Sequence, residues 1–314
     1  MFIHRASDIP SSEITSENVY RNRRKFIKDA SAFLASVAAS SIVQSKPGAY
    51  DTAEKITPHE YATTYNNYYE FGTDHADPAK NSGNFKAKPW KVSVEGLVKR
   101  PAAYDLDDLI KGLIMEDRVY RMRCVERWSM VIPWRGFPLA ELIKRLEPTP
   151  SARYIEFKTI LARDQMPGQR SRLFGGGLNW PYVEGLRMDE AMNPLTLIAM
   201  GIYGKPLPNQ NGAPLRLVTP WKYGFKGIKA IVAIRFVEKQ PVSSWMESWP
   251  QAYGFYSNVN PSVDHPRYSQ AREQRVGESR NPFFGDSTKP TLMFNGYGEQ
   301  VAQMYAGMDL RKNY

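Results

Sequence analysis

Residues 119–134 read VYRMRCVERWSMVIPW and carry Cys124, the single cysteine of the 314-residue chain. Around it, Tyr120 and Met122 alternate with Arg121 and Arg123. Alternation with a period of two predicts a β-strand on which Cys124 shares the face of Tyr120 and Met122. One cysteine excludes an intramolecular disulfide framework, a CxxC redox pair and a multi-cysteine zinc or iron–sulfur site. The segment therefore predicts a strand that presents the only thiol available for chemistry.

The segments on either side of this strand alternate between strand-like and helix-like patterns without a regular order. Strands are predicted over 90–98, 154–158, 215–218 and 228–237, and helices over 105–112 and 137–146. Long connections with Gly and Pro cover 165–189, 203–214 and 240–290. Because strands outnumber helices and no GxGxxG motif opens a helix after a strand, we expect a mixed α+β domain with long loops. A doubly wound sheet with a Rossmann nucleotide site does not fit this order.

The composition is that of a folded protein. Hydrophobic residues make up 42% of the chain and charged residues 24%, which excludes a wholly disordered polypeptide. No stretch reaches the roughly 18–20 apolar residues of a membrane-spanning helix. The formal net charge of +10 leaves nucleic acid, acidic proteins and membrane surfaces open as partners.

The first 45 residues have the pattern of an export signal. Arg23 and Arg24 precede Phe26, and residues 30–43 read ASAFLASVAASSIV. A basic region followed by a short apolar stretch and small residues is typical of a secretory signal, and paired arginines are typical of the twin-arginine (Tat) pathway, which exports folded proteins. The alternative is an amphipathic terminal helix. We predict a cleaved Tat signal over 1–45 and a single mature domain over 46–314.

Cys124 admits two main interpretations. A lone free cysteine on a strand is most often a buried apolar residue. An oxidising compartment disfavours an exposed reactive thiol, and no second cysteine exists to resolve a sulfenic acid. The functional alternative is a thiolate that binds a soft metal, for which an organic cofactor would have to supply the remaining ligands.

Three segments could hold such an anionic, heterocyclic cofactor. Residues 221–229, WKYGFKGIK, place three lysines and two glycines in nine positions, and residues 211–216, NGAPLR, set Arg216 beside a turn. Glycine backbone and cationic side chains suit phosphate binding. Residues 65–71, YNNYYEF, combine aromatic and amide groups suited to a flat ring system. Solvated hairpin ends and an aromatic core edge are the structural alternatives.

Residues 121–130, together with Pro133 and Trp134, resemble the cysteine-bearing segment of molybdopterin enzymes of the sulfite-oxidase fold. Five further segments, in the same order, resemble the family of periplasmic protein-methionine-sulfoxide reductase catalytic subunits. They are YNNYYEFG (65–72), MPGQ (166–169), GGGLNWPYVEGLRMDEAM (175–192), NQNGAPLRLVTPWKYGFKGIK (209–229) and YGFYSNVNPSVDHPR (253–267). The resemblance runs from about residue 58 to the end of the chain, and a twin-arginine leader is expected of the family.

The resemblance implies a sulfite-oxidase-like, molybdopterin-binding α+β fold with mixed sheets and no C-terminal dimerisation domain. It implies one Mo-molybdopterin per chain, with Cys124 as the molybdenum ligand and catalytic residue. The residues implied to contact the molybdopterin are Asn66, Tyr69, Glu70, Thr159, Asn211, Arg216, Gly227, Ile228 and Lys229.

The resemblance also implies an activity and a cellular setting. The expected reaction is removal of the oxygen atom from methionine sulfoxide in oxidised periplasmic proteins, which repairs them. Electrons are expected from a haem b-containing membrane subunit of the MsrQ type and the quinone pool. The Tat translocase is the expected partner during export, and no nucleic acid is expected. Sulfite oxidation, nitrate reduction and a non-enzymatic cofactor-storage or membrane-docking module are the alternatives.

Overall fold

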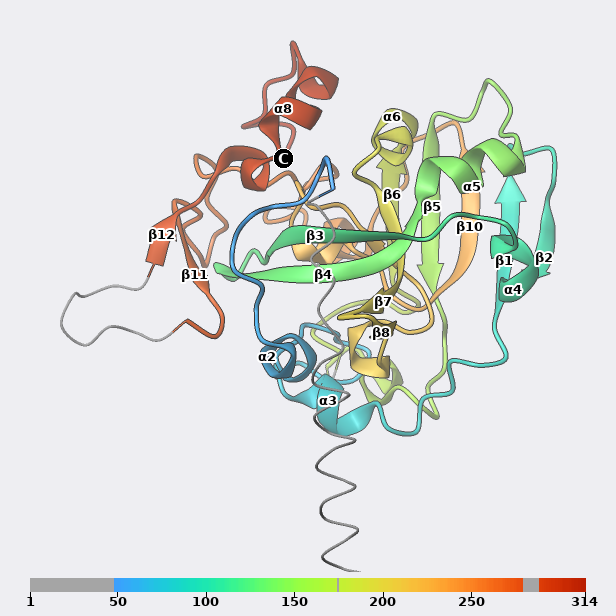
Figure 1. Cartoon of the computed structure of the whole chain (residues 1–314), viewed down its shortest axis with the longest axis horizontal. Helices are drawn as coiled ribbons and strands as arrows, with labels where there is room; N and C mark the ends of the chain where they lie inside the picture. The colour runs from blue at the N-terminus through green and yellow to red at the C-terminus, as the bar shows by residue number, and fades with distance from the viewer. Residues whose placement is uncertain (1–47, 174, 279–287) are drawn as a thin grey trace, which may run out of the picture. The chain divides into compact units, whose positions relative to one another are not determined.

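The computed structural model describes residues 48–173, 175–278 and 288–314, and residues 48–314 form one compact unit. The predicted export signal over residues 1–45 lies outside the described residues. The unit contains two mixed β-sheets with short helices around them (Figure 1). This architecture agrees with the predicted α+β class.

The first sheet has the strand order β2-β1-β10-β5-β6. Its strands are β1 (Lys91–Gly96), β2 (Ala102–Asp105), β5 (Tyr154–Thr159), β6 (Val183–Arg187) and β10 (Ile231–Val237). β1 and β10 pair in parallel, and the other neighbours are antiparallel. Along β5, alternate residues are buried, because one face of the strand packs into the apolar core.

The second sheet follows the order β12-β11-β4-β7-β8, with β3 paired to β4 and β9 paired to β7. Its strands are β3 (Glu116–Arg123), β4 (Trp128–Pro138), β7 (Leu197–Ile202), β8 (Lys205–Pro206), β9 (Arg216–Val218), β11 (Arg272–Arg275) and β12 (Thr288–Pro290). The long strand β4 is central, because it pairs with β3, β7 and β11.

The helices of the described residues are short. The α-helices are α2 (His59–Thr64), α3 (Asp77–Asn81), α4 (Leu106–Ile110), α5 (Leu139–Leu146), α6 (Met188–Met192), α7 (Ser244–Ser248) and α8 (Gly298–Val301). The 3₁₀ turns are η2 (Pro167–Arg170), η3 (Asn209–Asn211), η4 (Gly224–Lys226), η5 (Met293–Gly296) and η6 (Ala302–Tyr305). Among the residues described, no helix has the length and apolar character needed to cross a membrane.

Most predicted elements are confirmed. The strands predicted over 90–98, 154–158, 215–218 and 228–237 correspond to β1, β5, β9 and β10, and the helices over 105–112 and 137–146 correspond to α4 and α5. The three long connections are not free of regular structure: they contain β6, the start of α6, β8, α7, β11 and β12. Among the described residues after Val237, the only strands are the short strands β11 and β12.

The prediction that one strand runs through residues 119–134 is wrong. The segment forms the antiparallel pair β3–β4, in which Arg123 lies opposite Ser129. The Cys124 amide donates to the carbonyl of Trp128 at 2.9 Å and the Arg127 amide to the carbonyl of Cys124 at 3.0 Å. Arg127 adopts a left-handed backbone with φ 75°. This conformation is uncommon for residues other than glycine and is not found within a regular β-strand. Cys124 therefore opens a turn between two strands.

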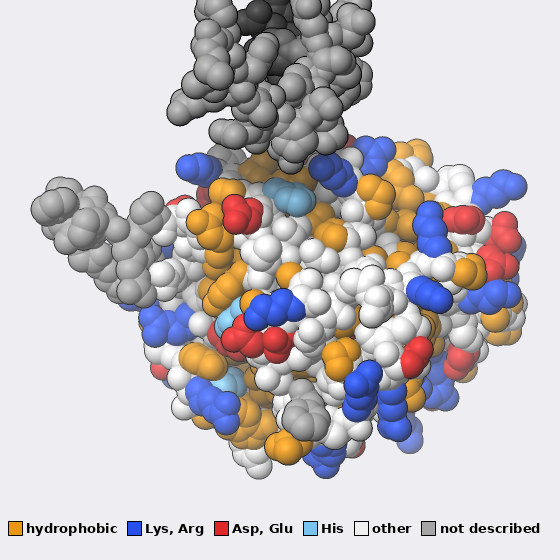
Figure 2. Space-filling model, turned by 90° about the horizontal axis from the view of Figure 1, so that it is seen from below, with side chains coloured by type: hydrophobic (Ala, Val, Ile, Leu, Met, Phe, Trp, Pro, Cys, Tyr) orange, Lys and Arg blue, Asp and Glu red, His pale blue; other side chains and the backbone are white. Residues whose placement is uncertain are grey.

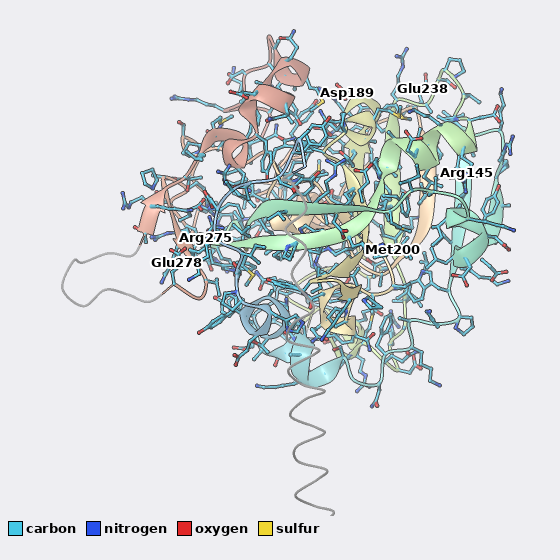
Figure 3. All side chains as sticks on the ribbon, in the orientation of Figure 1. Arg145, Asp189, Met200, Glu238, Arg275 and Glu278 are labelled. Atoms are coloured by element: carbon cyan, nitrogen blue, oxygen red, sulfur yellow. The ribbon has the colours of Figure 1, made fainter. Side chains whose placement is uncertain are left out.

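The positive charge does not form one continuous patch on the face shown in Figure 2. Lys and Arg side chains are spread over this face with Asp and Glu side chains among them. Arg145 on α5 and Arg275 on β11, both labelled in Figure 3, lie on different elements far apart in the view. Basic residues are thus not gathered in one place on this face.

Two lysines of the 221–229 segment are buried in ion pairs. Lys222 Nζ lies 2.6 Å from Glu190 Oε1, and Lys226 Nζ lies 2.8 Å from Glu184 Oε1, with all four side chains wholly buried. Lys222 also donates to Asn258 Oδ1 at 3.0 Å. The expectation of a three-lysine anion cradle is therefore wrong for Lys222 and Lys226, which anchor the segment to β6 and α6.

We predict that Lys222→Met lowers the free energy of unfolding by about 3–5 kcal/mol, because Glu190 would remain buried without its cation. Denaturant unfolding of the purified protein measures this loss. Lys222→Met combined with Glu190→Gln should recover part of it, since the buried charge is then removed. The exposed pair Lys144–Glu141, at 2.7 Å, supplies the control: Lys144→Met should change stability by less than about 0.5 kcal/mol. Equal effects of the two lysine substitutions would contradict the prediction.

Candidate active site

The residues around Cys124 enclose a cavity of about 930 Å³, a volume that includes open solvent at its mouth. Its lining comes from the segment before α3, the β3–β4 hairpin and the loops that flank β9, η4 and α7. Nine of the ten predicted site residues line this one cavity. They are Cys124, Asn66, Tyr69, Glu70, Asn211, Arg216, Gly227, Ile228 and Lys229.

Thr159 is the predicted site residue that does not line the cavity. It is buried on β5, and its hydroxyl donates to the backbone carbonyl of Lys229 at 2.7 Å. The observed role of Thr159 is thus to fix the backbone of a lining residue. Direct contact between Thr159 and a cofactor stays a prediction.

The Cys124 thiol is buried, with 6% of the residue exposed. Burial and the nearby Glu126 carboxylate raise the pKa of Cys124 to about 12, so the free protein holds a protonated thiol. A soft metal ion binds the thiolate and displaces this proton. Within the described part of the chain, no group of three His, Cys, Asp or Glu side chains could hold a metal ion, so a metal bound by Cys124 requires ligands from another molecule.

A hydrogen-bonded cluster surrounds the thiol. Asn67 Nδ2 lies 3.3 Å from Cys124 Sγ and 2.9 Å from Glu126 Oε2. The same Glu126 oxygen lies 2.8 Å from His75 Nε2 and accepts from Trp128 Nε1 at 3.1 Å. The hydrogen bonds from His75, Asn67 and Trp128 lower the pKa of Glu126 to about 2, although burial alone would raise this pKa. Glu126 is therefore a fixed carboxylate that orients Asn67 toward the sulfur.

Sequence reasoning assigned no role to these neighbours of Cys124. Asn67 and Glu126 lie inside the quoted segments 65–72 and 121–130, so those segments contained the only available signal. His75 lies outside every quoted segment, and its ring stacks on Tyr65 with centroids 4.1 Å apart. His75 and Glu126 are 51 residues apart in the sequence, so only the tertiary structure shows that they are in contact.

Another part of the cavity is cationic. Arg216 donates to the carbonyls of Asn211 at 3.1 Å and Gly227 at 3.3 Å, and Lys229 Nζ lies 4.9 Å from the centroid of the Tyr68 ring. Burial lowers the pKa of Arg216 to about 10, and burial together with Arg216 lowers the pKa of Lys229. In the residues that the structure describes, no carboxylate lies within ion-pair distance of either cation.

Glu70 is the acidic residue that shares this part of the cavity. Its side chain is 5% exposed, and burial raises its pKa, while the charge of Lys229 opposes the shift. Because burial raises the pKa of Glu70 and lowers that of Lys229, these two groups together carry little net charge, and Arg216 leaves the site positive. An anionic group such as a phosphate would offset the cost of burying these charges.

Several buried polar atoms of residues that line the cavity have no hydrogen-bond partner. They are Asn66 Oδ1, Asn67 Oδ1, Tyr68 OH, Trp134 Nε1, Asn211 Oδ1 and Arg216 Nε. Buried polar groups are ordinarily paired, and this set contains both donors and acceptors. A ligand rich in ring nitrogens, oxygens and phosphate would satisfy them, so the residues present fit a molybdopterin.

Gly227 shows why the cationic wall requires a glycine. A Cβ atom at this position would lie 2.8 Å from both Arg216 Nη2 and the carbonyl oxygen of Leu217. Any side chain would therefore displace the guanidinium or the backbone of β9. The glycine lets the two segments approach closely enough to close this side of the cavity.

Comparisons with known proteins agree with this geometry. Residues 79–245 match the family model described as "Oxidoreductase molybdopterin binding domain". The chain is 56% identical to the protein-methionine-sulfoxide reductase catalytic subunit MsrP of Ralstonia nicotianae, over 98% of this chain and 97% of that relative. It is 54% identical to the MsrP subunits of Burkholderia mallei, over 98% and 96%, and Gluconobacter oxydans, over 96% and 96%.

A solved structure, the sulfane dehydrogenase SoxCD from Paracoccus pantotrophus, aligns with a TM-score of 0.42 and 16% identity, over 54% of this chain and 42% of that chain. The assignment does not depend on that partial likeness. It follows from the domain match over more than half of the chain and from the near-complete alignment with three relatives. The chain belongs to the MsrP family of protein-methionine-sulfoxide reductase catalytic subunits.

Proposed function

We propose that this chain is a molybdenum-dependent oxidoreductase that reduces methionine sulfoxide residues in proteins, with one Mo-molybdopterin per chain. One observation carries the proposal: nine residues expected at a molybdopterin site line a single cavity that contains the only cysteine and six unpaired polar atoms. When bound, the cofactor supplies a metal centre that takes up an oxygen atom and exchanges two electrons.

The chain's own residues bind and orient the reactants. Cys124 offers its sulfur to the metal, and Asn67, held by Glu126, keeps a hydrogen-bond donor on that sulfur. Arg216 and Lys229 bind the phosphate of the cofactor, while Asn66 and Asn211 present unpaired amide oxygens to its ring system. Overall, the sulfoxide takes up two electrons and two protons and yields a thioether and water.

The cellular setting is part of the same proposal. Paired arginines before a short apolar stretch support export of the folded protein by the Tat translocase into the periplasm. The substrates would then be oxidised periplasmic proteins. The relatives are named catalytic subunits, which supports a separate electron donor, and we propose a haem b-containing membrane subunit that draws on the quinone pool.

Metal analysis and turnover together test the function. Purified protein should contain about one molybdenum per chain and should reduce both free and protein-bound methionine sulfoxide with an artificial reductant. Sulfite and nitrate serve as comparison substrates. Turnover of sulfite or nitrate without turnover of the sulfoxide would overturn the proposed activity, and loaded protein that turns over no substrate would favour a storage module.

Cys124→Ser should abolish sulfoxide turnover, with a loss of several orders of magnitude, because a hydroxyl is a hard and weakly acidic replacement for a soft thiolate ligand. The protein should fold and retain the pterin, since the cationic and amide residues are unchanged. Activity is normalised to folded, metal-containing protein. If Cys124 were only a core residue, serine would cost about 1–3 kcal/mol of stability with activity per folded molecule retained. That outcome would refute the ligand assignment.

Lys229→Ala should lower pterin occupancy about tenfold or more at limiting cofactor, because a charge-assisted hydrogen bond contributes roughly 1.5–3 kcal/mol. Occupancy is measured from the pterin released on denaturation. Lys239→Ala removes the same charge from an exposed position and should leave occupancy unchanged. Full occupancy in Lys229→Ala, with loss of binding to a polyanion such as heparin, would assign the loop to another function.

Replacement of both Arg23 and Arg24 by lysine should retain the folded, metal-loaded protein inside the cell, because the Tat pathway requires the arginine pair. Fractionation of cells that express each variant measures export. Arg5→Lys, which lies outside the pair, should be exported normally. Unimpaired export of the double variant would show that residues 1–45 are not a Tat signal.

A further inference from the structure

The segment 253–267 borders the cavity, and the cofactor assignment gives it no role. Its first residue, Tyr253, is 9% exposed and lines the cavity together with Cys124. The ring of Tyr253 stacks on Trp245 with centroids 4.7 Å apart and meets the edges of Phe225 at 5.0 Å and His265 at 5.3 Å. Packing on several sides fixes the direction of the phenol group.

The hydroxyl of Tyr253 is an unused donor. No hydrogen bond joins it to another side chain or backbone group of the described residues, and Tyr253 lines the cavity although only 9% of the residue is exposed. Burial, followed by the charges of Tyr69, Cys124 and Glu126, raises the pKa of Tyr253, so the hydroxyl keeps its proton at every physiological pH.

The side chains around this hydroxyl differ from those that suit the cofactor's phosphate. Trp245 and Phe225 also line the cavity, and Tyr69 meets Trp245 edge to face at 5.4 Å. These rings form an apolar wall next to one polar donor. Glu126, the acidic group near Cys124, has three polar partners on its Oε2 atom, and no hydrogen bond joins it to Tyr253.

This combination matches the chemistry of a methyl sulfoxide. The sulfoxide oxygen accepts hydrogen bonds and donates none, while the methyl and methylene groups on sulfur are apolar and contact aromatic rings favourably. A phenol that cannot ionise is a suitable donor to such an oxygen, because it stays protonated and carries no charge that would bind competing anions.

We infer that the Tyr253 hydroxyl donates a hydrogen bond to the sulfoxide oxygen of the substrate, and that Trp245 and Phe225 receive the methylthio group. This inference rests on the proposed function and assigns the substrate part of the same cavity. The S–O bond would break on uptake of two electrons, which the bound cofactor would supply, and two protons from solvent, which gives a thioether and water. Tyr253 keeps its own proton throughout and discriminates sulfoxide from thioether.

Binding to the oxidised holoenzyme without a reductant tests this role, since no turnover can then occur. Titration calorimetry with N-acetylmethionine sulfoxide and with N-acetylmethionine compares ligands that differ by the oxygen atom. Tyr253→Phe should weaken binding of the sulfoxide about tenfold or more, the loss expected when a buried donor to a ligand is removed, and should leave thioether binding unchanged. The value of kcat/KM for the sulfoxide should fall by a similar factor.

Tyr61→Phe, at a 43% exposed position on α2, is the matched control and should change neither affinity. Molybdenum content and the unfolding midpoint of Tyr253→Phe should equal those of the wild type. Unchanged sulfoxide affinity, an equal loss for both ligands, or loss of molybdenum would each overturn the inference, the last by assigning the hydroxyl to the cofactor. If the wild type neither binds nor reduces the sulfoxide, the proposed function fails and this inference fails with it.

Discussion

The burial of lysines 222 and 226 constrains the active site more than any other interaction in the structure. An ammonium group can be removed from water only if a carboxylate and further acceptors replace its hydration. Glu190 and Glu184 meet this requirement at 2.6 and 2.8 Å. Because neither lysine can leave its partner without a large loss of stability, the turn between them and the glycine that follows have one position relative to β6 and α6.

A third buried ion pair holds the other side of the site. Arg123 is wholly buried, with its Nε 3.3 Å from Glu273 Oε2, and its guanidinium also donates to the carbonyl of Cys124. Glu273 in turn lies near Arg275 of β11, labelled in Figure 3. The cysteine backbone is thus tied to β11 through a network of charged groups, which Ser129 and Thr291 extend by hydrogen bonds to Glu273 and Arg123. Such a network favours one arrangement of the chain, because any other arrangement would leave buried charged groups without hydrogen-bond partners, at a large cost in free energy.

Much of this arrangement follows from the sequence, and the exceptions have a common physical reason. Alternating apolar residues predict β1, β5 and β10, and helical spacing predicts α5, because local periodicity decides which face is buried. The turn at Cys124–Arg127 was missed because CVER contains no Gly, Pro, Asn or Asp, and a left-handed arginine leaves no local signal.

The same limit applies to the site. Of the ten site residues that the family resemblance predicted, nine line one cavity. The role of Lys222 and Lys226 in the glycine–lysine loop was nevertheless predicted wrongly. A basic turn has the same sequence whether its lysines face solvent or buried glutamates that lie 32 and 42 positions away. Likewise, the contact of His75 with Glu126 spans 51 residues, and only tertiary structure decides such pairs.

The burial of Cys124 bears on how a lone thiol would tolerate the proposed export to an oxidising compartment. Thiol oxidation proceeds through the thiolate, and a pKa of about 12 leaves almost none of that form in the free protein at neutral pH. Burial and the Glu126 carboxylate oppose ionisation of the thiol, and the charge of Arg123 only partly offsets them. A bound metal ion would add the positive charge that stabilises the thiolate. A protonated thiol is the less easily oxidised form, and a metal ion that displaced the proton would also occupy the sulfur.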